Sequence, residues 1–140
     1  ILIGTPVHLA ALRSRLLRNG FDVDAAVARD QYIALDARET LQTFMVNGWP
    51  DEALFEKTVD GLLARARSRH RKVRAFGEMV ALMWAEGQCG ATVHLEHLWT
   101  RLCNREAFSL FCAYPTAGFT QDSRDSIAQV CASHSKVYSL

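Results

Sequence analysis

The sequence predicts an α/β fold in which a mainly parallel sheet carries helices on both faces. The main observation is alternation: short apolar runs of strand length alternate with segments of helical periodicity along the 140-residue chain. Neighbouring parallel strands need such helical crossovers, which pack on the faces of the sheet. A second observation is that no linker, repeat or low-complexity tract divides the chain. We therefore expect one domain over residues 1–140.

The first fifty residues are predicted to contain two strands and two helices. Strands are expected at 1–3 and 32–35, helices at 5–20 and 36–48, and a connector with room for one helical turn at 21–29. Thr5 provides an N-cap hydroxyl and Pro6 suits the first helical position. Asp36 and Glu39 resemble a capping box, and Gly48 is expected to end the second helix.

The rest of the chain continues the alternation. Helices are expected from Trp49 onward, at 79–86, around Leu95–Leu102 and around Ile127–His134, strands at 73–76 and 108–114, and chain breaks at Gly87 and Gly90. Apolar residues at spacings of three and four, such as Leu95, Leu98 and Leu102, form the stripe that a helix buries against a core. Pro115 is expected to stop the last strand.

Composition and charge exclude several classes of partner. Hydrophobic residues make up 49% of the chain and charged residues 22%, which is ordinary for a folded soluble domain. The formal net charge is +1, so whole-chain charge predicts no direct nucleic-acid partner and no membrane surface. No apolar run approaches the ~20 residues that a membrane-spanning helix needs.

The chain start and the cysteines predict the cellular setting. Residues 1–5 form no signal peptide, since no basic lead precedes them and the apolar run is short. The chain lacks an initiator Met, and we therefore expect a fragment of a longer protein. The four cysteines, Cys89, Cys103, Cys112 and Cys131, have irregular spacing and no C-x-x-C pair. This pattern is typical of reduced, buried thiols in a cytoplasmic protein.

The strand at 73–76 ends at Gly77-Glu78 and passes directly into a helical pattern. Ligands of open α/β sheets bind at the carboxyl ends of the strands. Because a lone buried carboxylate is costly, Glu78 needs a partner, solvent or a ligand. We expect the functional site here, with Trp84 and Tyr114 as walls of a mainly apolar pocket. Aromatic residues at such spacings are more often part of the core.

Sequence motifs for nucleotide phosphates are missing. The chain contains neither G-x-x-x-x-G-K-[ST] nor G-x-G-x-x-G, and no other glycine-rich turn follows a strand. Without such a turn, backbone N–H groups cannot wrap a triphosphate. We predict no cofactor. A phosphate loop upstream of this segment would instead favour a nucleotide-binding switch.

Other residues with reactive side chains have simpler explanations. His94 and His97 lie three apart on an expected helix, but zinc needs three or four ligands, so we predict no metal site. Cys112 and His134 could meet as nucleophile and base, yet a buried structural thiol is the commoner arrangement. The basic run over 65–74 is more often a solvated helix end than a phosphate site.

Several phrases occur together in one order. They are Tyr32–Ala37, Phe44–Pro50, Arg74–Gly87, Leu95–Trp99 and Phe108–Pro115. In this order the chain resembles the MEDS domain, the methanogen/methylotroph DcmR-type sensory domain, over nearly its whole length. The Gly-Glu-Met-Val and Cys-Ala-Tyr-Pro phrases carry most of the resemblance.

The resemblance implies a degenerate RecA/KaiC-like α/β fold without a working phosphate loop. Members usually begin earlier in the sequence, so this chain is expected to lack a first strand or to receive it from a partner chain, as in a homodimer. The positions that match the family pattern are expected to bind ligand: Glu78, Trp84, Glu86, Glu96, Trp99, Cys112 and Tyr114. Among them, Glu78 is expected to be the polar anchor.

The resemblance further implies a small-molecule-sensing domain of a prokaryotic signal-transduction protein. The expected ligands are hydrocarbon derivatives, and the expected partner is a linked or associated histidine kinase or DNA-binding regulator. We expect no enzyme activity. Two alternatives remain: a protein–protein interaction module on a degenerate ATPase fold, and an enzyme that uses Glu78 or Cys112 as base or nucleophile.

Overall fold

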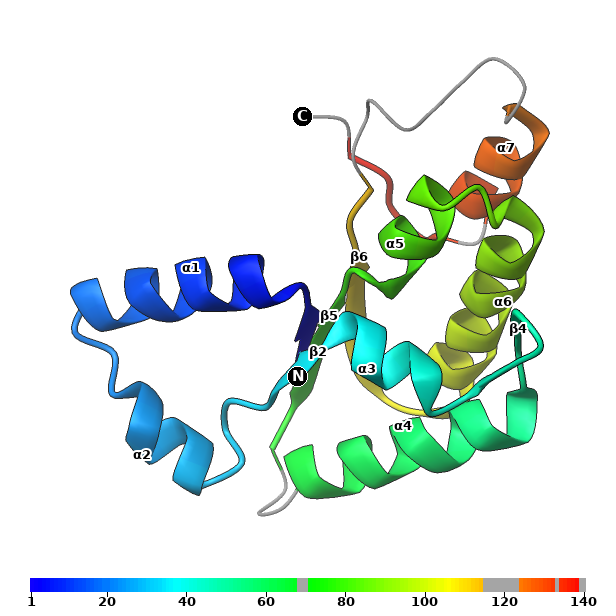
Figure 1. The fold of residues 1–140 in the computed structure, drawn as a ribbon. Coiled ribbons are helices and arrows are strands. Elements are labelled where there is room, and N and C mark those ends of the chain that lie inside the picture. Colours follow the sequence, from blue (N-terminus) through cyan, green and yellow to red (C-terminus); the bar gives the residue numbers. More distant parts are fainter. Residues whose placement is uncertain (68–70, 115–123, 133, 139–140) are drawn as a thin grey trace.

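The computed structural model describes residues 1–67, 71–114, 124–132 and 134–138, and it contains an all-parallel sheet of four strands (Figure 1). The strands are β1 (Leu2–Gly4), β2 (Ala34–Asp36), β5 (Val73–Gly77) and β6 (Phe108–Cys112), in the order β2-β1-β5-β6. Leu2 pairs with both Ala34 and Phe76, so β1 lies inside the sheet. The predicted α/β class with a parallel sheet is confirmed.

Helices flank both faces of this sheet, as predicted. On one side lie α1 (Pro6–Arg18) and α2 (Val23–Ala28), and on the other α3 (Ala37–Gln42), α4 (Glu52–Ala66), α5 (Met79–Ala85) and α6 (Cys89–Arg105) (Figure 1). α7 (Arg124–Ala132) packs against α6. The arrangement is consistent with a RecA-like α/β fold. In the part of the chain that the structure describes, no helix has the length and apolarity needed to cross a membrane.

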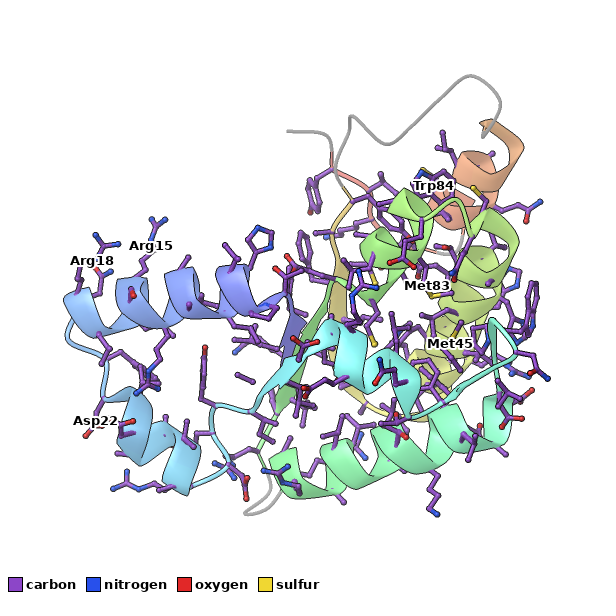
Figure 2. The ribbon with its side chains drawn as sticks, in the orientation of Figure 1. Arg15, Arg18, Asp22, Met45, Met83 and Trp84 are labelled. Carbon is purple, nitrogen blue, oxygen red and sulfur yellow. The ribbon has the colours of Figure 1, made fainter. Side chains whose placement is uncertain are left out.

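Side-chain caps fix where four of these helices begin. The capping side chains are Thr5 for α1, Asp22 for α2, Asp36 for α3 and Asp51 for α4, and each accepts a hydrogen bond from a backbone N–H of the first turn. The predicted caps at Thr5 and Asp36 are thereby confirmed. At the other end of α1, Arg15 and Arg18 lie in the last turn, where the helix dipole stabilises positive charge. Both side chains point away from α2 (Figure 2).

The predicted helix over 36–48 is wrong in its second half. α3 ends at Gln42, and a short hairpin of β3 (Met45–Val46) and β4 (Trp49–Pro50) follows it. Asn47 and Gly48 form its two-residue turn with φ values of 50° and 77°. Asn-Gly favours this turn because both central residues must adopt positive φ. The hairpin therefore takes Met45 and Val46 from the helix expected over 36–48. It also takes Trp49 and Pro50 from the start of the next expected helix, since α4 begins only at Glu52.

Smaller differences concern element ends. The expected connector at 21–29 contains α2, and the expected chain break at Gly90 falls inside the first turn of α6. Gly87 does break the chain, with a φ of 76° just after α5. The last strand ends at Cys112 rather than at residue 114, so Tyr114 lies beyond the carboxyl end of β6. Pro115, the expected strand stop, is outside the described residues.

The main core lies between the sheet and the helices α3 to α6. Its aromatic centre consists of Phe44, Phe55 and Trp99, whose rings meet edge to face at centroid distances of 5.4 Å and 4.9 Å. The predicted apolar stripe of α6, with Leu95, Leu98, Trp99 and Leu102, is fully buried here. This packing determines which face of α6 points toward the core and which faces flank it.

The opposite face of the sheet is covered less completely. α1 contributes no fully buried side chain. Alternation along β5 and β6 places Phe76 and Phe111 on this face, where their rings stack with centroids 5.9 Å apart. Phe111 is 54% exposed. On this side Phe111 is therefore open to solvent, while Phe76 beneath it is half-buried.

Several arginines of the basic run form ion pairs with neighbouring acids or a hydrogen bond with a backbone carbonyl group. Arg65 pairs with Asp30 at 2.7 Å, and Arg67 pairs with Glu106 at 2.5 Å. Arg71 donates a hydrogen bond to the carbonyl of Arg29. These contacts tie the end of α4 to nearby loops, which accords with a solvated helix end. Residues 69 and 70 of the run lie outside the described residues.

Candidate functional site

A buried carboxylate lies in the middle of α6. The Glu96 side chain is only 2% exposed, and its neighbours on the helix include the core residues Leu95 and Trp99. Burial raises the pKa of Glu96, and this effect outweighs the hydrogen bond from Tyr114 and the charge of His134, both of which lower it. A buried acid is costly unless polar groups surround it. The surroundings of Glu96 therefore decide what it does.

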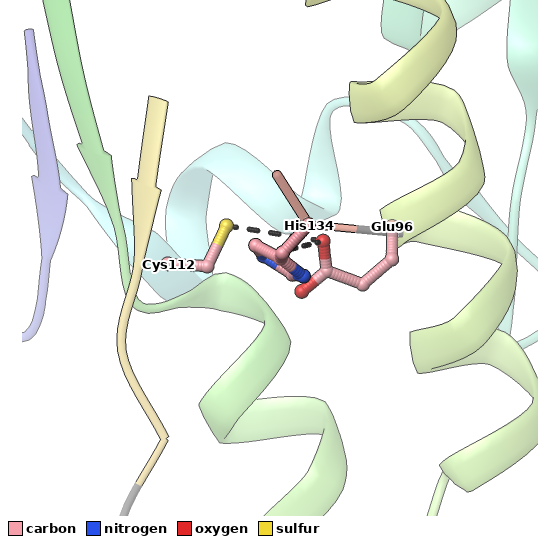
Figure 3. A group of neighbouring side chains, drawn as sticks. All are labelled: Glu96, Cys112 and His134. Carbon is pink, nitrogen blue, oxygen red and sulfur yellow. Dashed lines mark hydrogen bonds and ion pairs between the residues drawn. The ribbon is translucent and has the colours of Figure 1, made fainter. Parts of the chain in front are cut away.

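Three polar side chains converge on this carboxylate, and Figure 3 shows two of them, Cys112 and His134. The Tyr114 hydroxyl donates to Oε1 at 2.5 Å, and the Cys112 thiol donates to Oε2 at 3.9 Å. His134 Nε2 lies 3.6 Å from Oε2. Glu96 thus has a tyrosine, a cysteine and a histidine around it.

The partners of Glu96 come from three separate parts of the fold. Cys112 and Tyr114 lie at and just beyond the carboxyl end of β6, where open α/β sheets place their ligands. His134 lies two residues beyond α7, and its Nδ1 is 2.7 Å from the carbonyl oxygen of Val130. That contact makes Nδ1–H the donor and orients Nε2 toward Glu96. The cluster is therefore assembled by tertiary structure rather than by a local motif.

A cavity of about 320 Å³ opens beside the cluster. Its lining includes Glu96, Trp99, Cys103, Asn104, Ser109 and His134. Glu96, Trp99 and Cys103 follow each other at spacings of three and four on α6, so one helix face supplies much of the wall. The mixture of an aromatic wall with a few polar groups suits a small ligand.

The thiols of this region are held in their protonated form. Burial, and then the negative charge of Glu96, raise the pKa of Cys103 to about 11. The same two causes raise the pKa of Cys112 further. Burial also raises the pKa of Tyr114. At neutral pH these groups are hydrogen-bond donors rather than nucleophiles, because the thiolate is the reactive form of cysteine.

The structure brings together five of the seven residues expected to bind ligand. Cys112 and Tyr114 contact Glu96, and Trp99 lines the same cavity. Trp84 of α5 meets the Tyr114 ring edge to face at 6.1 Å. Glu86 lies apart from this group, where it forms a 2.7 Å ion pair with Arg38 on the surface.

Glu78, the expected polar anchor, has a different environment. It follows β5, next to β1, at the point where the chain order across the sheet reverses. Its Oε2 accepts a 2.8 Å hydrogen bond from the Thr5 N–H, and its Oε1 lies 2.6 Å from His8 Nδ1. Glu78 thus joins β5 to the start of α1. It places a carboxylate where a helix N-terminus would otherwise attract a phosphate.

A second cavity, of about 300 Å³, lies between α1, α2 and β2. Leu9, Val27, Ile33 and Leu35 give it apolar walls, and Arg13 and Arg65 lie at its edges. The Tyr32 hydroxyl, which also lines it, is buried without a hydrogen-bond partner. This cavity carries far fewer polar groups than the one at Glu96.

A protein-family comparison agrees with this architecture. Residues 1–135 match the model of the MEDS family, the methanogen/methylotroph DcmR sensory domain. The chain belongs to the MEDS family. No curated protein and no solved structure matches this MEDS chain. The match covers both Glu78 and Glu96, so only the geometry distinguishes the two acids.

The histidine pair of α6 does not form part of the cluster. His94 stacks on Trp49 with ring centroids 5.4 Å apart, and His97 is exposed. As metal ligands, the sequence analysis considered only this local pair, and it considered His134 only as a possible base for Cys112. His134 reaches the cluster from beyond α7. The available signal was the helix register: Thr92 and Glu96 continue the face of Trp99, and all three are buried. A charged residue in such a register indicates a buried polar cluster.

Proposed function

We propose that this MEDS domain senses a small organic molecule in the cavity at Glu96. The observation that carries the proposal is a buried carboxylate, Glu96, that lines a cavity together with His134. Tyr114 and Cys112 hold this carboxylate by hydrogen bonds. Such groups fix the orientation of a small ligand, while Trp99 provides apolar contact area. A cavity of this size suits a hydrocarbon derivative with a polar group.

The route from ligand to signal runs through the elements that build the cluster. His134 lies just beyond α7, whereas Glu96 and Cys112 lie on α6 and β6. A ligand that binds Glu96 and His134 together favours the arrangement in which α7 is docked. It can bias a linked kinase or DNA-binding domain only through its different affinities for docked and undocked states.

We propose binding rather than catalysis. The Cys112 thiol is a poor nucleophile at neutral pH, because burial raises its pKa. A nucleotide is disfavoured as ligand because the Glu78 carboxylate already accepts the N–H at the start of α1.

A thermal-shift screen of the full chain tests the proposal. The panel contains short-chain alcohols, carboxylic acids, halocarbons and nucleotides. A compound at 100 times its Kd stabilises the folded state by about 2.7 kcal/mol, which raises Tm clearly. We expect an organic hit whose effect is lost in Tyr114→Phe and kept in Tyr32→Phe. The reverse pattern would move the site to the cavity beside α1, and nucleotides as the sole hits would refute the proposal.

The second candidate function is a protein–protein interaction module. The exposed Phe111, which stacks on the half-buried Phe76, supports it, because aromatic residues open to solvent are common at interfaces. No organic hit in the screen would favour this alternative. The variant Phe111→Ser would then be expected to abolish partner binding without lowering Tm.

A further inference from the structure

Three different metal-ligating groups meet at the Glu96 cluster. A carboxylate oxygen of Glu96, the sulfur of Cys112 and a ring nitrogen of His134 all lie within 4.8 Å of one another. Zinc uses these three ligand types, whereas magnesium and calcium prefer sets made of oxygen alone. The set is therefore selective for a borderline-soft divalent ion.

The distances between these atoms are close to those around a tetrahedral ion. Glu96 Oε2 lies 3.6 Å from His134 Nε2 and 3.9 Å from Cys112 Sγ. With metal–ligand bonds of about 2.0–2.3 Å, ligand atoms in a tetrahedron are about 3.4–3.6 Å apart. The third pair, Cys112 Sγ and His134 Nε2, lies within 4.8 Å, so rotamer adjustment of these side chains would complete the geometry.

The neighbours of the three ligands orient them toward a common point. His134 Nδ1 is 2.7 Å from the Val130 carbonyl, which fixes the proton on Nδ1 and directs the Nε2 lone pair at Glu96. A backbone carbonyl in this position is the usual second partner of a metal-binding histidine. Tyr114 donates to Oε1, which leaves Oε2 as the atom facing Cys112 and His134.

We propose that Glu96 Oε2, Cys112 Sγ and His134 Nε2 bind a zinc-class divalent cation whose fourth position faces the cavity. On binding, the Cys112 S–H bond breaks, its proton passes to solvent, and the sulfur lone pair forms the bond to the metal. The fourth position would hold water or the polar atom of an organic ligand. The inference deepens the proposed sensing function of the same cavity, and it replaces the sequence-based prediction of no metal site, which considered only His94 and His97.

Cobalt spectroscopy of the full chain tests the ligand set directly. The chain is stripped with a chelator, titrated with Co²⁺ and then with Zn²⁺. We expect one equivalent of Co²⁺ to produce a sulfur-to-cobalt charge-transfer band and the visible absorption of a tetrahedral site, both removed by one equivalent of Zn²⁺. A titration without a charge-transfer band would overturn the proposal, whether or not the variants below fold.

Matched substitutions assign the band to individual residues. Cys112→Ala is expected to abolish the charge-transfer band, and His134→Ala to weaken Zn²⁺ binding by more than tenfold. Cys89→Ala and His94→Ala, which remove the same kinds of side chain from positions of α6 outside the cavity, are expected to leave the band and the Zn²⁺ affinity unchanged. Tyr114→Phe should weaken Zn²⁺ binding by about 10- to 100-fold, since it removes a partner of the Glu96 ligand. A band that survives Cys112→Ala refutes this ligand set.

Metal binding and organic-ligand sensing can fail separately. The Co²⁺ titration contains no organic compound, and the thermal-shift screen is run on both the chelator-stripped and the Zn²⁺-loaded chain. Organic hits without a cobalt band would refute the metal site and leave the sensing function. A cobalt band without organic hits would support the metal site and refute sensing of the compounds screened.

Discussion

Two acids of this chain, Glu78 and Glu96, differ in how the fold uses them. Glu78 lies at the carboxyl end of β5, where ligands of α/β sheets usually bind, yet it is engaged by the Thr5 N–H and by His8. Glu96 lies in the middle of a helix, yet it is buried beside a cavity and contacts Tyr114 and Cys112. Position in the topology therefore indicates where a site can form, and the partners of each side chain decide whether it does.

The contacts of Glu78 favour a structural role for this residue. Its carboxylate lies at the N-terminus of α1, which carries partial positive charge. Gly4 permits this approach, because a Cβ at that position would lie 3.1 Å from Glu78 Oε2. In phosphate-binding proteins, the N-terminus of a helix at such a position receives the phosphate. Here the protein supplies the anion itself.

Replacement of Glu78 gives the largest expected effect. Glu78→Ala removes the acceptor of the Thr5 N–H and should lower the free energy of unfolding by about 2 kcal/mol. Glu86→Ala, which removes an exposed acid paired with Arg38, should cost less than about 1 kcal/mol. Urea denaturation measures both. Equal losses in the two variants would contradict the structural role of Glu78.

The alkylation rate of Cys103 gives the next largest expected effect. With a pKa near 11, Cys103 should react with iodoacetamide at pH 8 about tenfold more slowly than an ordinary thiol, since the lower thiolate fraction exceeds the gain in nucleophilicity. Glu96→Gln should speed this reaction because it removes a negative charge. Mass spectrometry of the labelled peptides gives the rates, with exposed Cys131 as the internal reference. A Cys103 rate equal to that of Cys131 would contradict the raised pKa of Cys103.

The pH dependence of stability reports on Glu96 itself. Its pKa is raised above the ordinary value of 4.5 by burial, so the charged form is disfavoured in the folded state. The contribution of Glu96 to stability is therefore fully present below pH 4.5 and is lost as pH rises through the folded pKa. In metal-free protein, Glu96→Gln should remove this loss and raise the free energy of unfolding at pH 7. A variant with the wild-type pH profile would contradict the burial of a titrating carboxylate.

The smallest effect concerns the partner of Glu78. His8 is 66% exposed, so its contact with Glu78 is screened by water. His8→Ala should change the free energy of unfolding by less than about 0.5 kcal/mol. Thermal denaturation at pH 6 and pH 8 measures the change. A loss as large as that of Glu78→Ala would show that the ion pair, and not the hydrogen bond to Thr5, holds the start of α1.

Much of the fold was predictable because local signals specify it. The caps Thr5 and Asp36 and the apolar stripe of α6 are read from neighbouring residues. The hairpin at Asn47-Gly48 was missed since helical periodicity was extended past a turn signal that should have overruled it. Where helical periodicity and an Asn-Gly turn signal predicted different structures, the chain formed the turn.

The site was less predictable because its parts are distant in sequence. Cys112 and His134 reach Glu96 from β6 and from beyond α7. Their possible meeting could be stated from the sequence, but not their common partner. The family resemblance supplied Glu96 as a position, without its burial. Glu78 attracted attention because a strand-end acid is visible in sequence, whereas its contact with Thr5 depends on the pairing of β1 with β5.

The central claim is that Glu96, and not Glu78, is the acid of the ligand site. The most direct measurement is the rise in Tm produced by the strongest organic compound of the screen, compared in the wild-type chain, Glu96→Gln and Glu78→Gln. The account predicts that the rise is lost in Glu96→Gln and kept in Glu78→Gln, although the second variant starts from a lower Tm. A rise that is kept in Glu96→Gln and lost in Glu78→Gln would contradict it.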